Sequence, residues 1–305
     1  MDEGKRSWSW IRGIGDTARA LFWVLAVLGA LFGLTQVLGR RAVDKARDDL
    51  VRSFEQERQS RVVALIHRQE DVSLFGVPVS SHISIEDSEA VLRAIRLTPP
   101  EQPIDLILHT PGGLVLAAEQ IAKALVEHKG KVTVFVPHYA MSGGTLLALA
   151  ADEIVMDANA VLGPVDPQIG GMPAGSIVKL LALKRPMQIS DEMLILADMA
   201  QKARLQVVSF VAQVLLKHLP EKKAVELATV LSEGRWTHDF PLTVQAVQQF
   251  GLNVSTAMPR KVYDLMDLYP QGGGGRPSVL YVPVRRGSDQ PRQATDSPTP
   301  RPPTK

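Results

Sequence analysis

The chain contains no cysteine, which excludes disulfide bonds, thiolate metal sites and a cysteine nucleophile. It also has little excess of either charge, because 34 Lys+Arg against 32 Asp+Glu leave a net charge of +2. The basic stripe that a nucleic-acid partner requires is absent from the sequence. By contrast, 45% of the 305 residues are hydrophobic, which is enough to form a substantial core and excludes disorder of the whole chain.

The longest hydrophobic run, ALFWVLAVLGALFGLTQVL at 20–38, carries no charge and is just long enough to span a bilayer. A cleavable signal peptide is the alternative, but no small-residue cleavage site closes the run and two arginines follow it directly. Residues 1–39 are therefore expected to contain one transmembrane helix. Six basic residues in 40–58 against four in 5–19 slightly favour a cytoplasmic position for the rest of the chain.

Segments of different composition flank the central part of the chain. Residues 40–59 combine mixed charges with apolar residues at helical spacing, which predicts a charged juxtamembrane helix, either solvated or packed against a copy of itself. Residues 271–305 begin with a run of glycines and end rich in proline, so a flexible tail is expected there, with one short candidate strand at 279–284. The folded domain is expected at 60–270.

The central region alternates short β-rich runs with helical stretches. Strands are expected at 61–67, 104–109, 131–136 and 153–156, and helices at 86–97, 114–127, 142–150 and 191–219. This alternation predicts an α/β fold with a parallel sheet and helices on its faces. Sites in such folds lie at the carboxyl ends of the strands.

Two loops stand at such strand ends. The first passes through Gly112 and Gly113, whose lack of a Cβ lets a backbone N–H point into a cleft, as an oxyanion donor must; an ordinary strand-to-helix turn has the same composition. The second places Ser142 before Gly143 and Gly144 at the start of a helix. A serine there suits a nucleophile stabilised by the helix dipole, and it equally suits a helix N-cap.

The two loops together resemble a known family. HTPGG at 109–113 and, further along the chain, YAMSGGTLLALAADEIVMDANAVLGPVDPQIG at 139–170 look like the active-site core of the Clp-protease/crotonase superfamily. The fit is closest to membrane-anchored serine peptidases related to signal peptide peptidase A, the serine dehydrogenase proteinases, and covers roughly residues 60–255. The resemblance implies a ClpP-like fold of repeated ββα units, a homo-oligomer, Ser142 as nucleophile, and the Gly113 and Gly143 amides as oxyanion hole.

The general base is the open question. A Clp-type triad would place a histidine downstream of the serine, at the point where this chain has Asp166 in Val-Asp-Pro-Gln. Resemblance to signal-peptide-peptidase-like enzymes implies instead a Ser-Lys dyad, with Lys202 as the first candidate, Lys184 as the second, and Lys179 also within range. Lys202 has a structural alternative, because Asp198 four residues earlier would form a helical surface ion pair with it.

Other polar residues are assigned lesser roles. His138 is an alternative to lysine but suits a structural or rim position better, and His109 is placed to line the cleft. Asp166 suits a turn cap or an oligomer contact. Paired histidines or acidic clusters at metal spacing are lacking in the sequence, so neither a metal nor another cofactor is expected.

The resemblance implies a membrane-anchored serine endopeptidase that hydrolyses peptide bonds through a Ser-Lys dyad and an acyl-enzyme, with membrane-associated polypeptides among its substrates. The sequence has no phosphate loop, so ATP is not expected to take part. It also lacks the G-x-G-x-x-G fingerprint that a dehydrogenase would need. Two alternatives stand beside the peptidase function. One is a crotonase-like acyl-CoA enzyme, which would use a carboxylate base. The other is a membrane-attached scaffold with a peptidase fold and no competent dyad.

Overall fold

The computed structural model describes residues 3–67, 72–74, 77–79 and 82–269. The tail expected at 271–305, with its candidate strand at 279–284, lies outside the described residues. The helices are α1 (Glu3–Arg58), α2 (Ile85–Leu97), α3 (Val115–Glu127), α4 (Gly143–Leu149), α5 (Ala174–Leu183), the 3₁₀ turn η1 (Pro186–Gln188), α6 (Asp191–Leu215), α7 (Glu221–Ser232), α8 (Val244–Gln249) and α9 (Arg260–Asp267). The strands are β1 (Arg61–Ile66), β2 (Val72–Leu74), β3 (Val77–Val79), β4 (Ile104–His109), β5 (Val132–Val136), β6 (Tyr139–Ala140), β7 (Glu153–Met156), β8 (Val161–Leu162), β9 (Gln168–Ile169), β10 (Met172–Pro173), β11 (Leu242–Thr243) and β12 (Val254–Ser255).

A five-stranded sheet in the order β1-β4-β5-β7-β12 forms the centre of the domain, and every pair in it is parallel. All residues of β4 and β5 are buried, as expected for strands of a parallel sheet that is covered on both faces. A smaller sheet, β11-β8-β6, stands beside the carboxyl end of β5. The predicted parallel sheet is therefore present, and its four expected strands lie where the sequence pattern placed them, within one residue at either end.

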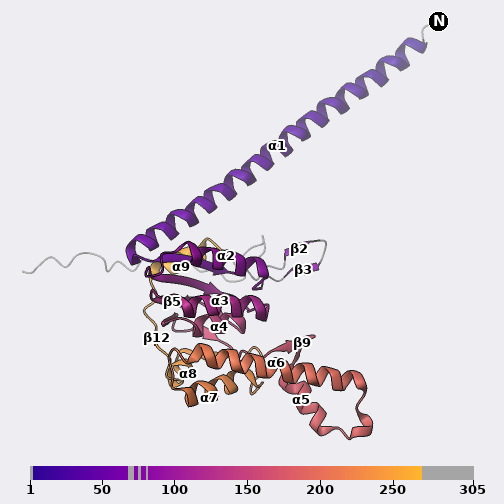
Figure 1. Ribbon diagram of the computed structural model, residues 1–305. Helices are drawn as coiled ribbons and strands as arrows, with labels where there is room; N and C mark the ends of the chain where they lie inside the picture. Colours follow the sequence, from indigo (N-terminus) through magenta and orange to yellow (C-terminus); the bar gives the residue numbers. More distant parts are fainter. Residues whose placement is uncertain (1–2, 68–71, 75–76, 80–81, 270–305) are drawn as a thin grey trace, which may run out of the picture.

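Alternate residues of the strands serve two separate cores. Leu106 of β4 and Val134 of β5 face the larger core, which α3, α4, α6 and α7 complete. Ile107 and Phe135, each one position further along, face a second core that includes the end of α1 and α9. Figure 1 shows the resulting layers, with α1 and α9 on one side of the sheet and α3, α4 and then α6 on the other.

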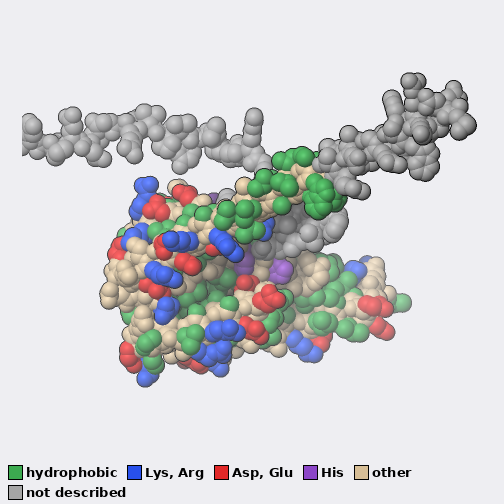
Figure 2. All heavy atoms as spheres, turned by 90° about the horizontal axis from the view of Figure 1, so that it is seen from above, with side chains coloured by type: hydrophobic (Ala, Val, Ile, Leu, Met, Phe, Trp, Pro, Cys, Tyr) green, Lys and Arg blue, Asp and Glu red, His purple; other side chains and the backbone are tan. Residues whose placement is uncertain are grey.

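Helix α1 joins the expected transmembrane segment and the expected juxtamembrane helix into one continuous element. Among the described residues it is the one helix long and apolar enough to cross a membrane, and its apolar side chains from Phe22 to Leu38 are exposed (Figure 2). Its last turns pack on the sheet, with Phe54 only 2% exposed. The apolar residues of 40–59 thus include a contact with the chain's own domain, which the sequence did not indicate.

A helical hairpin of α5 and α6 projects from the domain (Figure 1). The pattern predicted α6 but not α5, and α6 ends at Leu215 instead of residue 219. Small residues such as Ala174, Ala197 and Ala200 let the two helices pack closely at the base of the hairpin. The remainder of α6 crosses the domain beside α3 and α4, where it borders the two predicted loops.

Candidate active site

The first predicted loop follows β4 and pairs with Ile83 through its backbone. The Ile83 N–H donates to the Gly112 carbonyl at 2.7 Å, and the Leu114 N–H donates to the Ile83 carbonyl at 2.9 Å. In such a bridge the residue between the two bonds turns its own N–H to the opposite side. Gly113 holds that position, so its N–H is directed away from Ile83.

Only glycine fits at this position. A Cβ on Gly113 would lie 2.3 Å from the backbone N and O of Ile83, far inside van der Waals contact. Gly112 has a φ of 107°, a region that favours glycine, and its Cβ would lie 2.8 Å from the Cβ of Ser142. The loop is therefore shaped by close backbone approach on both sides, which an ordinary strand-to-helix turn does not require.

Ser142 stands in the second loop, directly before α4, with φ 50° and ψ −115°. A positive φ is uncommon outside glycine and costs free energy, and such residues concentrate at functional sites. Ser142 occupies the N-cap position, yet its side chain makes no capping hydrogen bond. The Ser142 hydroxyl is therefore not used as a helix cap, which was the structural alternative. Gly143 begins α4, where a backbone N–H has no intrahelical acceptor.

The two loops meet through Thr110. Its N–H donates to the carbonyl of Tyr139 at 3.3 Å, and its carbonyl accepts the N–H of Met141 at 3.0 Å. As a result Gly113, Ser142 and Gly143 line one cavity, together with residues of α3 and α6. The structure thus brings together the three residues predicted as nucleophile and oxyanion donors.

A series of hydrogen-bonded side chains that the sequence did not indicate supports the first loop. Asp87 lies 3.3 Å from Nε2 of His67, whose Nδ1 lies 2.7 Å from the Thr110 hydroxyl. Burial lowers the pKa of His67 and favours the neutral ring. Since a carboxylate only accepts, Nε2 carries the hydrogen and Nδ1 accepts from Thr110, whose oxygen accepts the Gly112 N–H at 3.1 Å. These hydrogen bonds hold the first loop in place beside Ser142.

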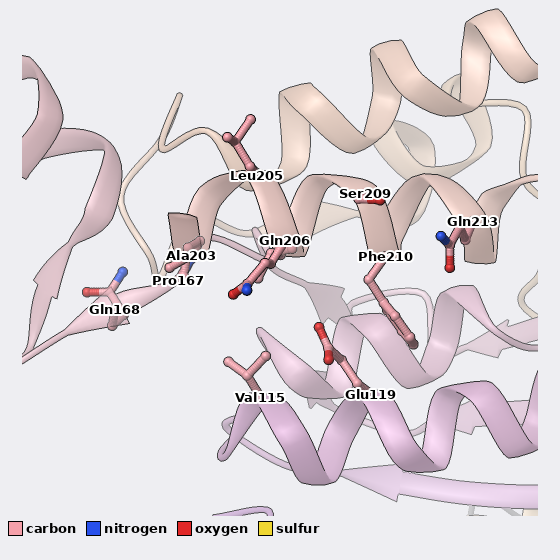
Figure 3. Close-up of a pocket in the computed structure, with 11 residues that line it drawn as sticks. Val115, Glu119, Pro167, Gln168, Ala203, Leu205, Gln206, Ser209, Phe210 and Gln213 are labelled. Atoms are coloured by element: carbon pink, nitrogen blue, oxygen red, sulfur yellow. The ribbon is translucent and has the colours of Figure 1, made fainter. Parts of the chain in front are cut away.

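The cavity at Ser142 is narrow, with a volume of about 20 Å³, which is room for about one water molecule. It adjoins a groove of about 730 Å³ between α3 and α6 (Figure 3). Residues common to both include Val115 and Glu119 of α3 and Phe210 of α6. Burial raises the pKa of the Glu119 carboxyl. The groove has the size of a site for an extended chain or a small ligand.

The predicted lysines lie away from the cavity. Lys202 is on α6 with its side chain 67% exposed, and its Nζ donates to Asp198 at 2.5 Å. This is the surface ion pair that the sequence offered as the structural alternative. Lys184 caps α5 and Lys179 lies within α5, and both are exposed. Neither the cavity nor the groove has a lysine among the described residues that line it.

The predicted histidines line neither the Ser142 cavity nor the groove, so His109 does not take the cleft-lining position expected for it. His138 is exposed and stacks on the ring of the buried His109, with ring centroids 5.7 Å apart. Tyr139 contacts both rings, at 4.3 Å from His109 and 5.2 Å from His138. This arrangement agrees with a structural position for His138.

Asp166 differs from its expected place. The sequence favoured a turn cap or an oligomer contact, but the residue is 2% exposed and lines the Ser142 cavity. Its carboxylate accepts from Gln168 Nε2 at 2.7 Å and pairs with His238 Nδ1 at 2.7 Å. This hydrogen bond raises the pKa of His238. An acid–histidine pair therefore stands at the cavity wall, built from two residues far apart in the chain that sequence spacing does not connect.

Comparisons with known proteins show which proteins this chain is similar to. A family described as ClpP-like SDH-type serine proteinase matches residues 15–296. Two proteins of Methanocaldococcus jannaschii are similar over most of their length: uncharacterized protein MJ1495 is 52% identical over 90% of this chain and 93% of its own, and uncharacterized protein MJ0137 is 56% identical over 78% and 83%.

Solved structures show more distant similarity. A mutant of the 1510-N membrane-bound stomatin-specific protease is 16% identical, with a TM-score of 0.42 over 68% of this chain and 82% of that one. ClpP1 of Listeria monocytogenes is also 16% identical, with a TM-score of 0.41 over 66% and 94%.

Proposed function

Because the chain belongs to the family of ClpP-like SDH-type serine proteinases, we propose that it is a membrane-anchored serine endopeptidase that hydrolyses polypeptides through Ser142 without ATP. The observation that carries the proposal is the strained Ser142, which makes no capping hydrogen bond and shares a cavity with Gly113 and Gly143. Strain of this kind at a serine beside unpaired helix N–H groups suits a nucleophile.

In the proposed reaction a base removes the Ser142 proton while Oγ attacks the carbonyl carbon of a peptide bond. The carbonyl oxygen becomes an oxyanion that accepts the N–H groups of Gly113 and Gly143. The intermediate then expels the amine, which takes the proton from the base, and leaves an acyl-enzyme. Water, deprotonated by the same base, hydrolyses the ester and restores the serine.

Lys202 remains the first proposed base, with Lys184 second. Positions 202, 206, 209 and 213 share one face of α6, and the last three line the groove beside Ser142. A change of rotamer would turn Lys202 from Asp198 toward the groove, at the cost of an exposed ion pair worth only about 0.3–0.5 kcal/mol. His238, already paired with Asp166 at the cavity wall, is the competing base.

The proposed anchor is the apolar part of α1. Its exposed side chains would be covered by lipid, and the close packing of Phe54 on the sheet would hold the groove at a defined orientation to the bilayer. Substrates would then be polypeptides at or near the membrane. A homo-oligomer is also proposed, on the resemblance to oligomeric ClpP-like enzymes.

The exposed position of Lys202 favours a second candidate function, a membrane-attached scaffold with a peptidase fold. In a scaffold the narrow cavity and the surface ion pair would be the resting arrangement, and no base would reach Ser142. The crotonase alternative is no longer proposed, because the family is one of serine proteinases.

Fluorophosphonate labelling of the full chain in detergent distinguishes the two functions. An active serine peptidase is expected to label, and Ser142→Ala is expected to abolish labelling. Lys202→Ala, Lys184→Ala and His238→Ala identify the base, and Asp198→Ala, which removes only the surface partner, is expected to label normally. Labelling that survives Ser142→Ala would overturn the nucleophile, and a folded wild type that does not label would favour the scaffold.

A further inference from the structure

Glu119 is the one carboxylate among the described residues that line the groove, and it lies next to the proposed reaction centre. Figure 3 shows its side chain rising from α3 toward α6, and the residue lines both the groove and the Ser142 cavity. The other polar side chains that line the groove are uncharged, namely Gln168, Gln206, Ser209 and Gln213. The described residues that line the groove therefore carry a single negative charge and no positive one.

Glu119 also lacks a cationic partner within the described residues. The cavity's other carboxylate, Asp166, pairs with His238 at 2.7 Å. On the same helix as Glu119, Glu127 lies 3.8 Å from Lys123. Glu119 forms neither an ion pair nor a hydrogen bond in the described part of the chain. Its charge is thus available to a group that enters the groove.

The cost of holding this charge points to a role in binding. Burial raises the pKa of Glu119, so the folded chain disfavours the carboxylate relative to the unfolded chain. At pH values above its ordinary pKa, such a carboxyl group lowers the stability of the fold. A cation brought in by a ligand would offset this desolvation through a charge-assisted hydrogen bond.

The walls around Glu119 suit a long cationic side chain. Val115 and Phe210 provide apolar surface beside the carboxylate, and lysine and arginine bury their aliphatic stems on such surfaces. The ring of Phe210 can also face a cation. A carboxylate beside apolar side chains in a groove would therefore prefer these side chains over neutral ones of the same length.

We propose that Glu119 selects polypeptide substrates that carry lysine or arginine within about two residues of the bond cleaved at Ser142. This distance follows because Glu119 lines the Ser142 cavity itself and an extended substrate rises by about 3.3 Å per residue. The inference rests on the proposed peptidase function and names its substrate class.

The test uses internally quenched peptides in which one scanned position holds arginine or its neutral isostere citrulline. The wild type in detergent is expected to cleave the arginine peptide with a kcat/KM at least tenfold higher at one position. Glu119→Gln is expected to bring this ratio close to one, and Glu119→Lys to favour a glutamate peptide instead. Glu127→Gln, the same change two turns later on α3, is the matched control and should keep the wild-type ratio.

A binding measurement separates this inference from the peptidase proposal. Full-length Ser142→Ala, which cannot turn over substrate by the proposed route, is titrated with the arginine and citrulline peptides at low and high salt. At least tenfold tighter binding of arginine, lost in Ser142→Ala/Glu119→Gln, would support the inference even if the wild type cleaves nothing. Equal binding of both peptides, or equal loss in the Glu127 control, would overturn it.

The melting temperature bears on the same point. Because the Glu119 charge is unfavourable in the folded chain, Glu119→Gln should not lower the melting temperature at pH 7. Unchanged peptide preference in Glu119→Gln together with a lower melting temperature would show a purely structural role and refute the proposal.

Discussion

Gly113→Ala tests whether the first loop supplies an oxyanion donor. The new Cβ would lie 2.3 Å from the backbone N and O of Ile83 and 2.7 Å from its Cα. Ordinary contacts begin near 3.5 Å, so the two segments must separate by about 1 Å. Both hydrogen bonds of Ile83 to the loop, at 2.7 and 2.9 Å, would lengthen with that shift.

The expected effect on reactivity follows from this displacement. A misplacement of about 1 Å costs on the order of 100-fold, and loss of one oxyanion donor costs about 100- to 1000-fold. The second-order rate of fluorophosphonate modification of Ser142 should therefore fall at least about 100-fold. Overpacking of this kind also lowers the free energy of unfolding by about 1–3 kcal/mol, which leaves the variant folded at low temperature.

Gly251→Ala is the matched control for backbone strain. Gly251 has a φ of 83°, but its Cβ would meet only a side-chain atom of Leu219, at 3.4 Å. This variant should lose about 1–2 kcal/mol of stability and label at the wild-type rate. If a folded Gly113→Ala also labels at the wild-type rate, Gly113 is not an oxyanion donor and the geometric reasoning fails.

Two further predictions concern stability. Asp105 is 1% exposed and accepts hydrogen bonds from Arg58 and, at 2.6 Å, from Ser60. Asp105→Ala should therefore lower the free energy of urea unfolding by about 3 kcal/mol. A loss below about 1 kcal/mol would contradict the role of the Arg58–Asp105 pair in holding α1 to the sheet. Asp166 raises the pKa of His238 above its ordinary 6.5. The stability that the Asp166–His238 pair contributes to the fold is therefore complete below pH 6.5 and is lost as the pH rises through the pKa of His238 in the folded chain. The melting temperature of His238→Gln should therefore differ most from wild type in acid and least in alkali, and a pH-independent difference would exclude the pair as a titrating contact.

Much of the fold was predictable because it depends on local periodicity. Runs such as Ile104–His109 are largely apolar, which indicates a strand buried on both faces, and the structure has that strand at the same residues. The family match confirms the predicted ClpP-like α/β fold. Helix α5 was missed because the mostly apolar segment Ala174–Leu183 shows little contrast between its faces.

The two loops of the site could be predicted from the sequence, but the residues of other elements that line the cavity and the groove could not. Gly113, Ser142 and Gly143 belong to two short motifs, and the structure brings them to one cavity. The pairing of Lys202 with Asp198 was also visible from their i,i+4 spacing on a helix. Glu119 carried no signal, because one glutamate on an amphipathic helix looks like any solvated residue.

The sequence by itself therefore determined which two loops form the candidate site, since the glycines and the serine in them shape the backbone through local conformation. Only the tertiary structure decided what surrounds them. Asp166 and His238 are distant in the chain and meet at the cavity wall, and Glu119 becomes a groove residue because α6 crosses α3. Burial and electrostatic pairing depend on which elements meet in space, and the same physics places Lys202 at the surface in an ion pair with Asp198.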